Sequence, residues 1–371
     1  MKIGFDAKRL FNNFTGLGNH SRTTVDILTE FYPENEYLLY TPRIKHNTVT
    51  DPYAERSGCR TIVPQGLLKG SAWRTFGLAS ALKKEGADIF HGLSNELPTQ
   101  LDIPTVVTIH DVAFKTFPDM YHLPDRFIYD WKWRHACKRA DRIIAISEST
   151  KQDIVRFYGV DPDTIDVVYQ PVNTLYYTND SGICPQSLAQ YTSHPYMLYV
   201  GSINSRKNLL GIVKAMELLP KDLQIPLIVI GGGREYKQKV EDYIAEHKLE
   251  DLIIFSPEKV GTEGLRYLYS NARLLIYPSF YEGFGLPVVE AMLSNCPVVT
   301  SNVSSLPEAA GPDSLLVDPY DIQDIADKIK VLLTDDTLRQ AIIQKGFRYA
   351  MDNFSPKVLA DRLMEVYNKL V

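Results

Sequence analysis

Two glutamates, Glu282 and Glu290, lie in the segment YPSFYEGFGLPVVE, residues 277–290. Pro287 stands where a helix would begin, since proline lacks the N–H that the first helical turn leaves unpaired. The pattern predicts a strand, a glycine-rich loop with exposed N–H groups, and a helix that carries Glu290 in its first turns. The two carboxylates can then reach different parts of one extended ligand, Glu282 a pair of sugar hydroxyls and Glu290 a ribose diol. The expected contacts are Glu282, Gly283, Phe284, Gly285, Leu286 and Glu290. We expect Glu282 to orient this ligand rather than to support the fold.

Two adjacent cations, Arg206 and Lys207, lie between a predicted strand at residues 196–200 and a predicted helix at residues 209–219. Positive side chains at a helix N-terminus oppose the helix dipole. An anionic ligand would relieve them, and a diphosphate fits. The alternative is a solvated surface pair.

Gly16 and Gly18 lie in a predicted loop, residues 10–19, before a helix near residues 19–28. Paired glycines ahead of a helix let backbone N–H groups approach an anion. An ordinary glycine turn is the alternative. The segment is not a dinucleotide fingerprint, because its third glycine would fall at Ser21.

His110 and Asp111 follow a predicted strand at residues 105–109. Side chains at the carboxyl end of a parallel strand can face a substrate, so His110 is a candidate for hydrogen bonding to a sugar hydroxyl and Asp111 for a substrate contact. A structural histidine is the alternative. Ser147 follows a strand at residues 143–146, where a helix cap is at least as good an interpretation as a substrate contact.

The elements that must position these residues are short runs rich in Ile and Val, separated by longer amphipathic stretches. This alternation predicts parallel sheets with helices on both faces, an α/β fold of two doubly wound lobes. We expect a first domain at residues 1–170, a breaker-rich linker at 171–195 and a second domain at 196–355. Residues 356–371 are expected to form a C-terminal helix that covers the second lobe or returns to the first.

Composition limits the partners. The chain of 371 residues carries a formal net charge of −5, which gives no overall electrostatic reason to expect nucleic acid. The four cysteines are widely spaced and read as reduced thiols of a cytoplasmic protein. The N-terminal residues enter a strand at once, so no signal peptide is expected. No apolar run is long enough to span a bilayer.

With these motifs, the chain resembles a retaining glycosyltransferase of family 4 over nearly its full length. The E-x7-E signature formed by Glu282 and Glu290 is the specific part of that resemblance. It implies a GT-B fold in which Lys207 and a nearby arginine hold the donor diphosphate. Many members place that arginine where this chain has Ser202, so Arg206 is the expected substitute.

The resemblance also implies that His110 lies near the transferred sugar and that Gly16 and Gly18 approach the donor phosphates. The two catalytic candidates are His110 and Glu282, and the ligands meet in a cleft between the lobes. Because Arg206, Lys207 and helix N-termini can meet the phosphate charge, neither a metal ion nor a cofactor is expected.

The predicted function is transfer of a hexose, with retained configuration, from a nucleotide-sugar to a glycan or lipid-linked glycan in cell-surface polysaccharide synthesis. GDP-mannose is the expected donor and a UDP-hexose the second choice. The alternatives are a nucleotide-sugar epimerase of the same fold and a catalytically silent sugar-nucleotide-binding protein.

Peripheral contact of the first lobe with the inner face of the membrane is a further hypothesis. Residues 126–139 mix aromatic and basic side chains in a predicted helix, a combination suited to a membrane interface. The favoured alternative is a helix that packs its aromatic residues on the sheet.

Overall fold

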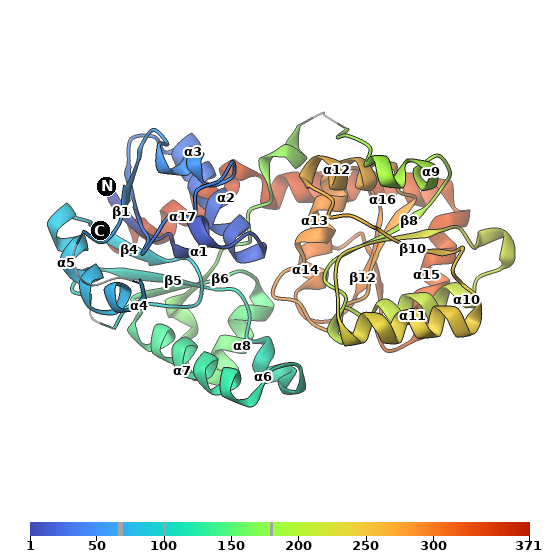
Figure 1. Cartoon of the computed structure of the whole chain (residues 1–371), viewed down its shortest axis with the longest axis horizontal. Coiled ribbons are helices and arrows are strands. Elements are labelled where there is room, and N and C mark those ends of the chain that lie inside the picture. The colour runs from blue at the N-terminus through green and yellow to red at the C-terminus, as the bar shows by residue number, and fades with distance from the viewer. Residues whose placement is uncertain (66–69, 100, 179–180) are drawn as a thin grey trace. The chain divides into compact units, whose positions relative to one another are not determined.

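The computed structural model describes residues 1–65, 70–99, 101–178 and 181–371. The chain divides into two compact units (Figure 1). Unit 1 comprises Met1–Asn173 together with Phe354–Val371, and unit 2 comprises Thr174–Asn353.

The described part of unit 1 contains a seven-stranded parallel sheet in the order β3-β2-β1-β4-β5-β6-β7. Its strands are β1 Lys2–Asp6, β2 Glu36–Tyr40, β3 Cys59–Ile62, β4 Ile89–Gly92, β5 Thr105–Ile109, β6 Arg142–Ala145 and β7 Ile165–Val167. β1 pairs with both β2 and β4, so the strand order reverses between β1 and β4. In open parallel sheets, ligands bind outside the carboxyl ends of the strands at such a switch point.

Helices cover both faces of the unit 1 sheet (Figure 1). On one face lie α1 Lys8–Asn12, α2 Gly16–Phe31 and α17 Pro356–Asn368. On the other lie α5 Leu78–Glu85, α7 Leu123–Arg139 and α8 Glu148–Tyr158. The shorter helices are α3 Asp51–Ala54, α4 Gly70–Ala72 and α6 Ala113–Thr116.

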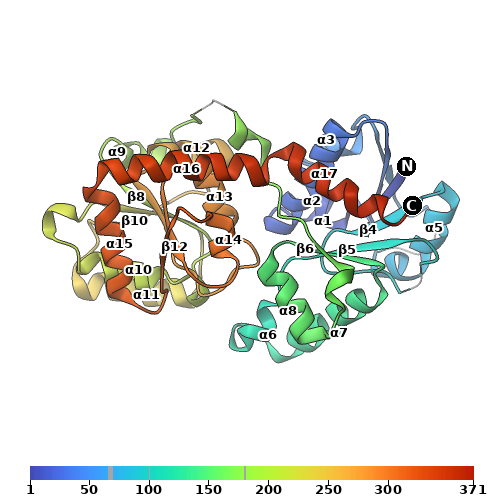
Figure 2. The same ribbon diagram turned by 180° about the vertical axis from the view of Figure 1, so that it is seen from behind.

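The C-terminal helix α17 returns to the first unit, which resolves the alternative left open by the sequence. It packs beside α2 (Figure 2) and buries Leu359 and Leu363 in the unit 1 core. Tyr367 is fully buried, and its hydroxyl lies 2.7 Å from Nδ1 of His91 on β4. The helix is therefore fastened to the centre of the sheet.

The described part of unit 2 contains a six-stranded parallel sheet in the order β10-β9-β8-β11-β12-β13. Its strands are β8 Met197–Val200, β9 Leu227–Ile230, β10 Ile253–Phe255, β11 Leu274–Tyr277, β12 Val298–Ser301 and β13 Leu315–Val317. Here the order reverses between β8 and β11. The prediction of two doubly wound α/β lobes is confirmed.

In unit 2, α10 Leu209–Glu217, α11 Glu235–His247 and α15 Ile322–Thr334 share one apolar core with the sheet. Helix α13 Leu286–Leu293 contacts β11 and β12, and α14 Leu306–Ala310 contacts β12. The remaining α-helices are α9 Ala189–Thr192, α12 Thr262–Asn271 and α16 Asp336–Phe354.

Most of the segment predicted as a linker, residues 171–195, lies in unit 2. The Arg266 guanidinium of α12 donates to the carbonyl oxygens of Leu175 and Thr178, and Tyr176 is fully buried. Residues 179 and 180 of this segment lie outside the described residues. Within the described ranges, no helix is long and apolar enough to cross a membrane.

Candidate functional site

Three functional candidates of unit 2, Arg206, Lys207 and Glu282, meet at its switch point. Arg206 and Lys207 follow β8 in a short 3-10 helix, Ser205–Lys207, and Glu282 follows β11. Because β8 and β11 are parallel neighbours, the segments that follow them leave the same edge of the sheet. Side chains that are far apart in sequence are thus brought into contact.

Glu282 is the centre of a buried ion network. One carboxylate oxygen lies 2.7 Å from Lys207 Nζ, and the other lies 3.0 Å from an Arg206 guanidinium nitrogen. The Tyr277 hydroxyl lies 3.1 Å from the oxygen that Lys207 contacts. Glu282 is only 8% exposed and Lys207 is equally buried. The two predicted cations therefore share one buried carboxylate of the chain itself.

The network sets the protonation of its members. Burial raises the pKa of the Glu282 carboxyl, but Lys207 and Arg206 outweigh that effect and hold the pKa at about 2. Burial lowers the pKa of Lys207, and Glu282 opposes this shift. Glu282 is therefore ionised at neutral pH while Lys207 and Arg206 remain beside it.

The loop that carries Glu282 is fixed by two serines after β12. Ser304 Oγ accepts a hydrogen bond from the Glu282 N–H at 3.1 Å, and Ser305 Oγ donates to the Phe284 carbonyl at 2.8 Å. Phe284 is buried in unit 2, so its side chain serves packing. Gly285 has a φ of +119°, a value that side chains rarely allow, and it precedes the first residue of α13.

Glu290 lies within α13, as predicted. The Tyr269 hydroxyl lies 3.1 Å from its carboxylate. Burial raises the pKa of Glu290 to about 7, and the Tyr269 hydrogen bond only partly opposes that shift. The carboxyl is therefore partly protonated at neutral pH.

His110 lies just past the end of β5 and is buried. Its Nε2 lies 2.9 Å from the Leu93 carbonyl oxygen and donates to it, while Nδ1 accepts from the Gln170 amide nitrogen at 2.9 Å. Burial lowers the pKa of His110, so the ring is neutral. The predicted bond to a sugar hydroxyl would require one of these two partners to give way.

Other candidates in unit 1 have structural explanations. Gly16 and Gly18 lie in the first turn of α2 rather than in a loop. The Gly18 N–H donates to Asn13 Oδ1 at 3.0 Å, and a Cβ at Gly18 would lie 1.8 Å from the Asn13 carbonyl oxygen. Asp111 accepts from the Ala113 N–H, and Ser147 caps α8 by accepting from the Thr150 N–H, both at 3.0 Å.

Residue types alone did not reveal several members of these sites. Tyr277 ends β11, and Gln170 and Asn95 follow β7 and β4, so the rule that ligands lie beyond strand ends could have selected them. Asn95 accepts from the His110 backbone N–H at 2.7 Å. His20 of α2 lies edge-on to His110, with ring centroids 4.5 Å apart. Among the described residues, no group of three or more His, Cys, Asp or Glu could hold a metal ion.

Comparison with known proteins places the chain in a family. The model described as Glycosyl transferases group 1 matches residues 183–349, and that described as Glycosyltransferase Family 4 matches residues 21–175. O-antigen chain mannosyltransferase B of Escherichia coli is 35% identical over 277 residues, which cover 73% of this chain and 72% of the relative. The chain belongs to the group 1 glycosyltransferases.

Further similarities agree with this group 1 glycosyltransferase assignment. O-antigen chain mannosyltransferase RfbU of Salmonella typhimurium is 28% identical and covers 68% of this chain and 67% of its own. A crystal structure of Anabaena Alr3699/HepE in complex with UDP and glucose aligns with a TM-score of 0.72 at 16% identity, covering 100% of this chain and 99% of that chain. The predicted GT-B fold and glycosyltransferase family are confirmed, and the epimerase alternative gains no support.

Replacing Glu282 tests its role in this group 1 glycosyltransferase. Glu282→Gln keeps the shape of the side chain but leaves Arg206 and Lys207 without their carboxylate, so the free energy of unfolding should fall by about 3 kcal/mol. A nucleoside diphosphate should then raise the melting temperature more in the variant than in the wild type. Urea denaturation and thermal shift measure both effects. Glu250→Gln, a change at an exposed glutamate of the same unit, should alter neither. Equal stability of Glu282→Gln and wild type would show that the network does not stabilise the fold.

The raised pKa of Glu290 predicts a pH dependence. A carboxyl that binds its proton more tightly when folded loses stability on deprotonation, so the wild type should become less stable relative to Glu290→Gln as pH rises from about 4.5 to about 7. The expected change in the difference is roughly 2–3 kcal/mol. Urea denaturation of both proteins across this pH range gives the curve. Parallel curves would show that Glu290 titrates normally.

Proposed function

We propose that this group 1 glycosyltransferase transfers mannose from GDP-mannose to a glycan or lipid-linked glycan, with retained configuration and without a metal ion. The observation that carries the proposal is the Arg206–Lys207–Glu282 network at the switch point of unit 2. The mannose assignment is supported by the two O-antigen mannosyltransferases at 35% and 28% identity. A UDP-hexose is the second donor candidate, since the Anabaena structure holds UDP.

Exchange of partners within the network would bind the donor. Lys207 and Arg206 contact the diphosphate oxygens, which replace part of their pairing with Glu282. Both cations also stabilise the negative charge that grows on the departing nucleoside diphosphate, and they do so without a divalent ion. The diphosphate thereby compensates the positive charge that one carboxylate leaves on the two cations.

The two glutamates would then hold the two ends of the donor. Glu282, which keeps part of its pairing with the two cations, accepts hydrogen bonds from sugar hydroxyls. Glu290, in the helix that follows the same loop, accepts from the ribose diol. Gly283, Phe284, Gly285 and Leu286 supply backbone groups between these two contacts, and Gly16 of unit 1 is proposed to approach the phosphates.

His110 would position the sugar rather than remove a proton. Both of its ring nitrogens already have partners, and burial lowers its pKa, so it is poorly suited to act as a general base toward an acceptor. Removal of the acceptor proton by an enzyme base is characteristic of inversion. A neutral, fixed His110 therefore agrees with the retention that the family resemblance implies.

Product analysis tests the proposal directly. The protein is incubated with GDP-mannose or UDP-glucose and with a fluorescent mannoside, free or linked to a lipid diphosphate. We expect mannose transfer that persists in excess EDTA and a product whose new bond, by NMR, has the configuration of the donor. Lys207→Ala should weaken nucleoside diphosphate binding by roughly 10- to 100-fold and leave nucleoside binding unchanged. Activity that requires added Mg²⁺ would refute metal independence, and a product of inverted configuration would refute retention.

We also propose that α7 contacts an anionic membrane surface. Leu123, Phe127 and Trp131 follow one another at four-residue spacing and are 63%, 75% and 62% exposed, whereas Tyr129 and Trp133 pack against Phe114. The expected packing on the sheet is thus seen for Trp133, which packs against the core of that sheet face, whereas Tyr129 contacts Phe114 of α6. The exposed cations of the helix, Arg134, Lys138 and Arg139, suit the anionic lipids of the inner leaflet.

A vesicle assay tests this contact. The wild type should sediment with vesicles containing phosphatidylglycerol and much less with phosphatidylcholine alone, because both apolar insertion and charge attraction contribute. The double change Leu123→Ser with Phe127→Ser should abolish sedimentation. Leu218→Ser removes a similarly exposed leucine from unit 2 and should leave it intact. Equal sedimentation of all three proteins would exclude α7 as the contact.

A further inference from the structure

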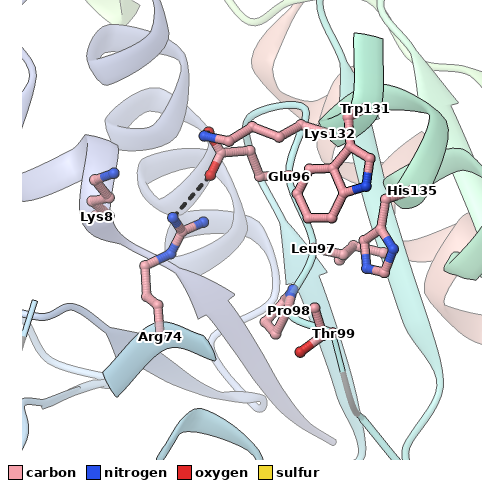
Figure 3. A pocket seen from close by; sticks show the side chains of 9 residues that line it. All are labelled: Lys8, Arg74, Glu96, Leu97, Pro98, Thr99, Trp131, Lys132 and His135. Atoms are coloured by element: carbon pink, nitrogen blue, oxygen red, sulfur yellow. Dashed lines mark hydrogen bonds and ion pairs between the residues drawn. The ribbon is translucent and has the colours of Figure 1, made fainter. Parts of the chain in front are cut away.

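Unit 1 has its own cavity at the switch point of its sheet, between the ends of β1 and β4. Its volume is about 220 Å³. Lys8 and Glu96 line it from the segments after these two strands, and Trp131, Lys132 and His135 line it from α7. Figure 3 shows Lys8 and Arg74 on one side of the cavity, Trp131 and His135 on the other, and Glu96 between them. The cavity occupies the position where ligands of such sheets bind.

The charges around the cavity do not balance. Arg74 pairs with Asp6 and, at 2.9 Å, with Glu96, while Lys132 Nζ lies 3.0 Å from Glu96. Lys8 has no ion-pair partner among the described residues. Burial lowers the pKa of Lys8, and the nearby Arg74 lowers it further. The three cations face two carboxylates, so one positive charge remains for an anion to compensate.

Both sides of the cavity also offer unused polar atoms. Among the described residues, Arg74 Nε and His135 Nε2 are buried without a hydrogen-bond partner. Unpaired buried polar groups are uncommon in folded proteins and often indicate a missing ligand or water. The Trp131 ring stacks on His135 at 5.6 Å between centroids, yet most of its surface is exposed. An open indole face beside a hydrogen-bonding group suits a sugar ring.

We propose that this cavity binds a phosphorylated sugar, with the phosphoryl group at Lys8 and Arg74 and the sugar ring at Trp131 and His135. The inference rests on the proposed function, in which that sugar is the part of the acceptor nearest its lipid anchor. It adds a substrate class to unit 1.

The chemistry favours phosphate over carboxylate as the anion. Bidentate recognition of a planar carboxylate requires two parallel N–H groups of an arginine guanidinium. The two terminal nitrogens of the Arg74 guanidinium already pair with Asp6 and Glu96. What remains includes the point charge of Lys8 and the Nε–H of Arg74, which has no partner among the described residues, an arrangement that fits the several oxygens of a phosphoryl group.

Size and position limit the ligand further. Pockets that enclose a whole drug-sized ligand measure roughly 300–1,000 Å³, so 220 Å³ holds one sugar and its phosphate rather than a whole oligosaccharide. Trp131 is also the last residue of the exposed stripe that begins at Leu123 and continues through Phe127. The sugar end of the ligand would therefore lie next to the face proposed to contact the membrane, and the phosphoryl end would lie across the cavity from it.

The test is a tryptophan-fluorescence titration with α-mannose 1-phosphate, in excess GDP so that unit 2 is occupied. We expect a saturable change, far weaker binding of methyl α-mannoside, and loss of the change in Trp131→Phe. Lys8→Gln should weaken binding roughly 10-fold or more. Since Lys8 forms no ion pair within the described ranges, this variant should keep its melting temperature. Lys138→Gln, at an exposed cation of α7 outside the cavity, should bind like the wild type.

Three outcomes would overturn the proposal: equal affinity for methyl α-mannoside, no effect of Lys8→Gln, or equal affinity for mannuronate, which would make the site a carboxylate site. The titration needs no turnover, so its result is independent of the proposed transfer reaction. A protein that transfers mannose but shows any of these outcomes would keep its function and lose this site. A protein that binds mannose 1-phosphate here but transfers no mannose would keep this site and lose the proposed function.

Discussion

The burial of one carboxylate between two cations determines much of unit 2. Removing Glu282 from water costs free energy unless Lys207 and Arg206 compensate its charge, and this requires the segments after β8 and β11 to lie together. The hydrogen bonds from Ser304 and Ser305 then fix the loop that leads into α13. The position of Glu290 follows from that loop, so one ion network orders both ends of the proposed donor site.

Unit 1 uses a similar device at the corresponding place. Arg74 joins Asp6, at the end of β1, to Glu96, which follows β4. In both units a buried network of charges joins the segments that follow the two strands of the switch point. The networks differ in the source of their uncompensated positive charge. In unit 2 two cations share one carboxylate, whereas in unit 1 the cation Lys8 lies next to a network in which it has no ion pair among the described residues. Each unit thus retains positive charge where an anionic ligand is proposed to bind.

The sequence predicted the fold class because fully buried parallel strands appear as isolated apolar runs. Strand β2 does not stand out as a run rich in Ile and Val, because its residues EYLLY contain neither. The sequence could not show that Glu282 contacts Lys207, because it places these residues far apart and only the adjacency of β8 and β11 joins them. In α7, aromatic residues two positions apart lie on nearly opposite sides of the helix, so Phe127 and Tyr129 cannot both face the sheet. Composition alone does not say which of them does.

The return of α17 to unit 1 has a consequence for the order of events during synthesis. Six residues of this helix belong to the unit 1 core: Leu359, Ala360, Leu363, Met364, Val366 and Tyr367. They leave the ribosome only after all of unit 2, which is continuous and can close its core earlier. Until α17 has been synthesised, unit 1 is therefore incomplete, and the apolar face around α2 remains uncovered. In this protein the unit that is synthesised first is completed last. The uncovered apolar face of unit 1 is the surface that a chaperone would have to shield.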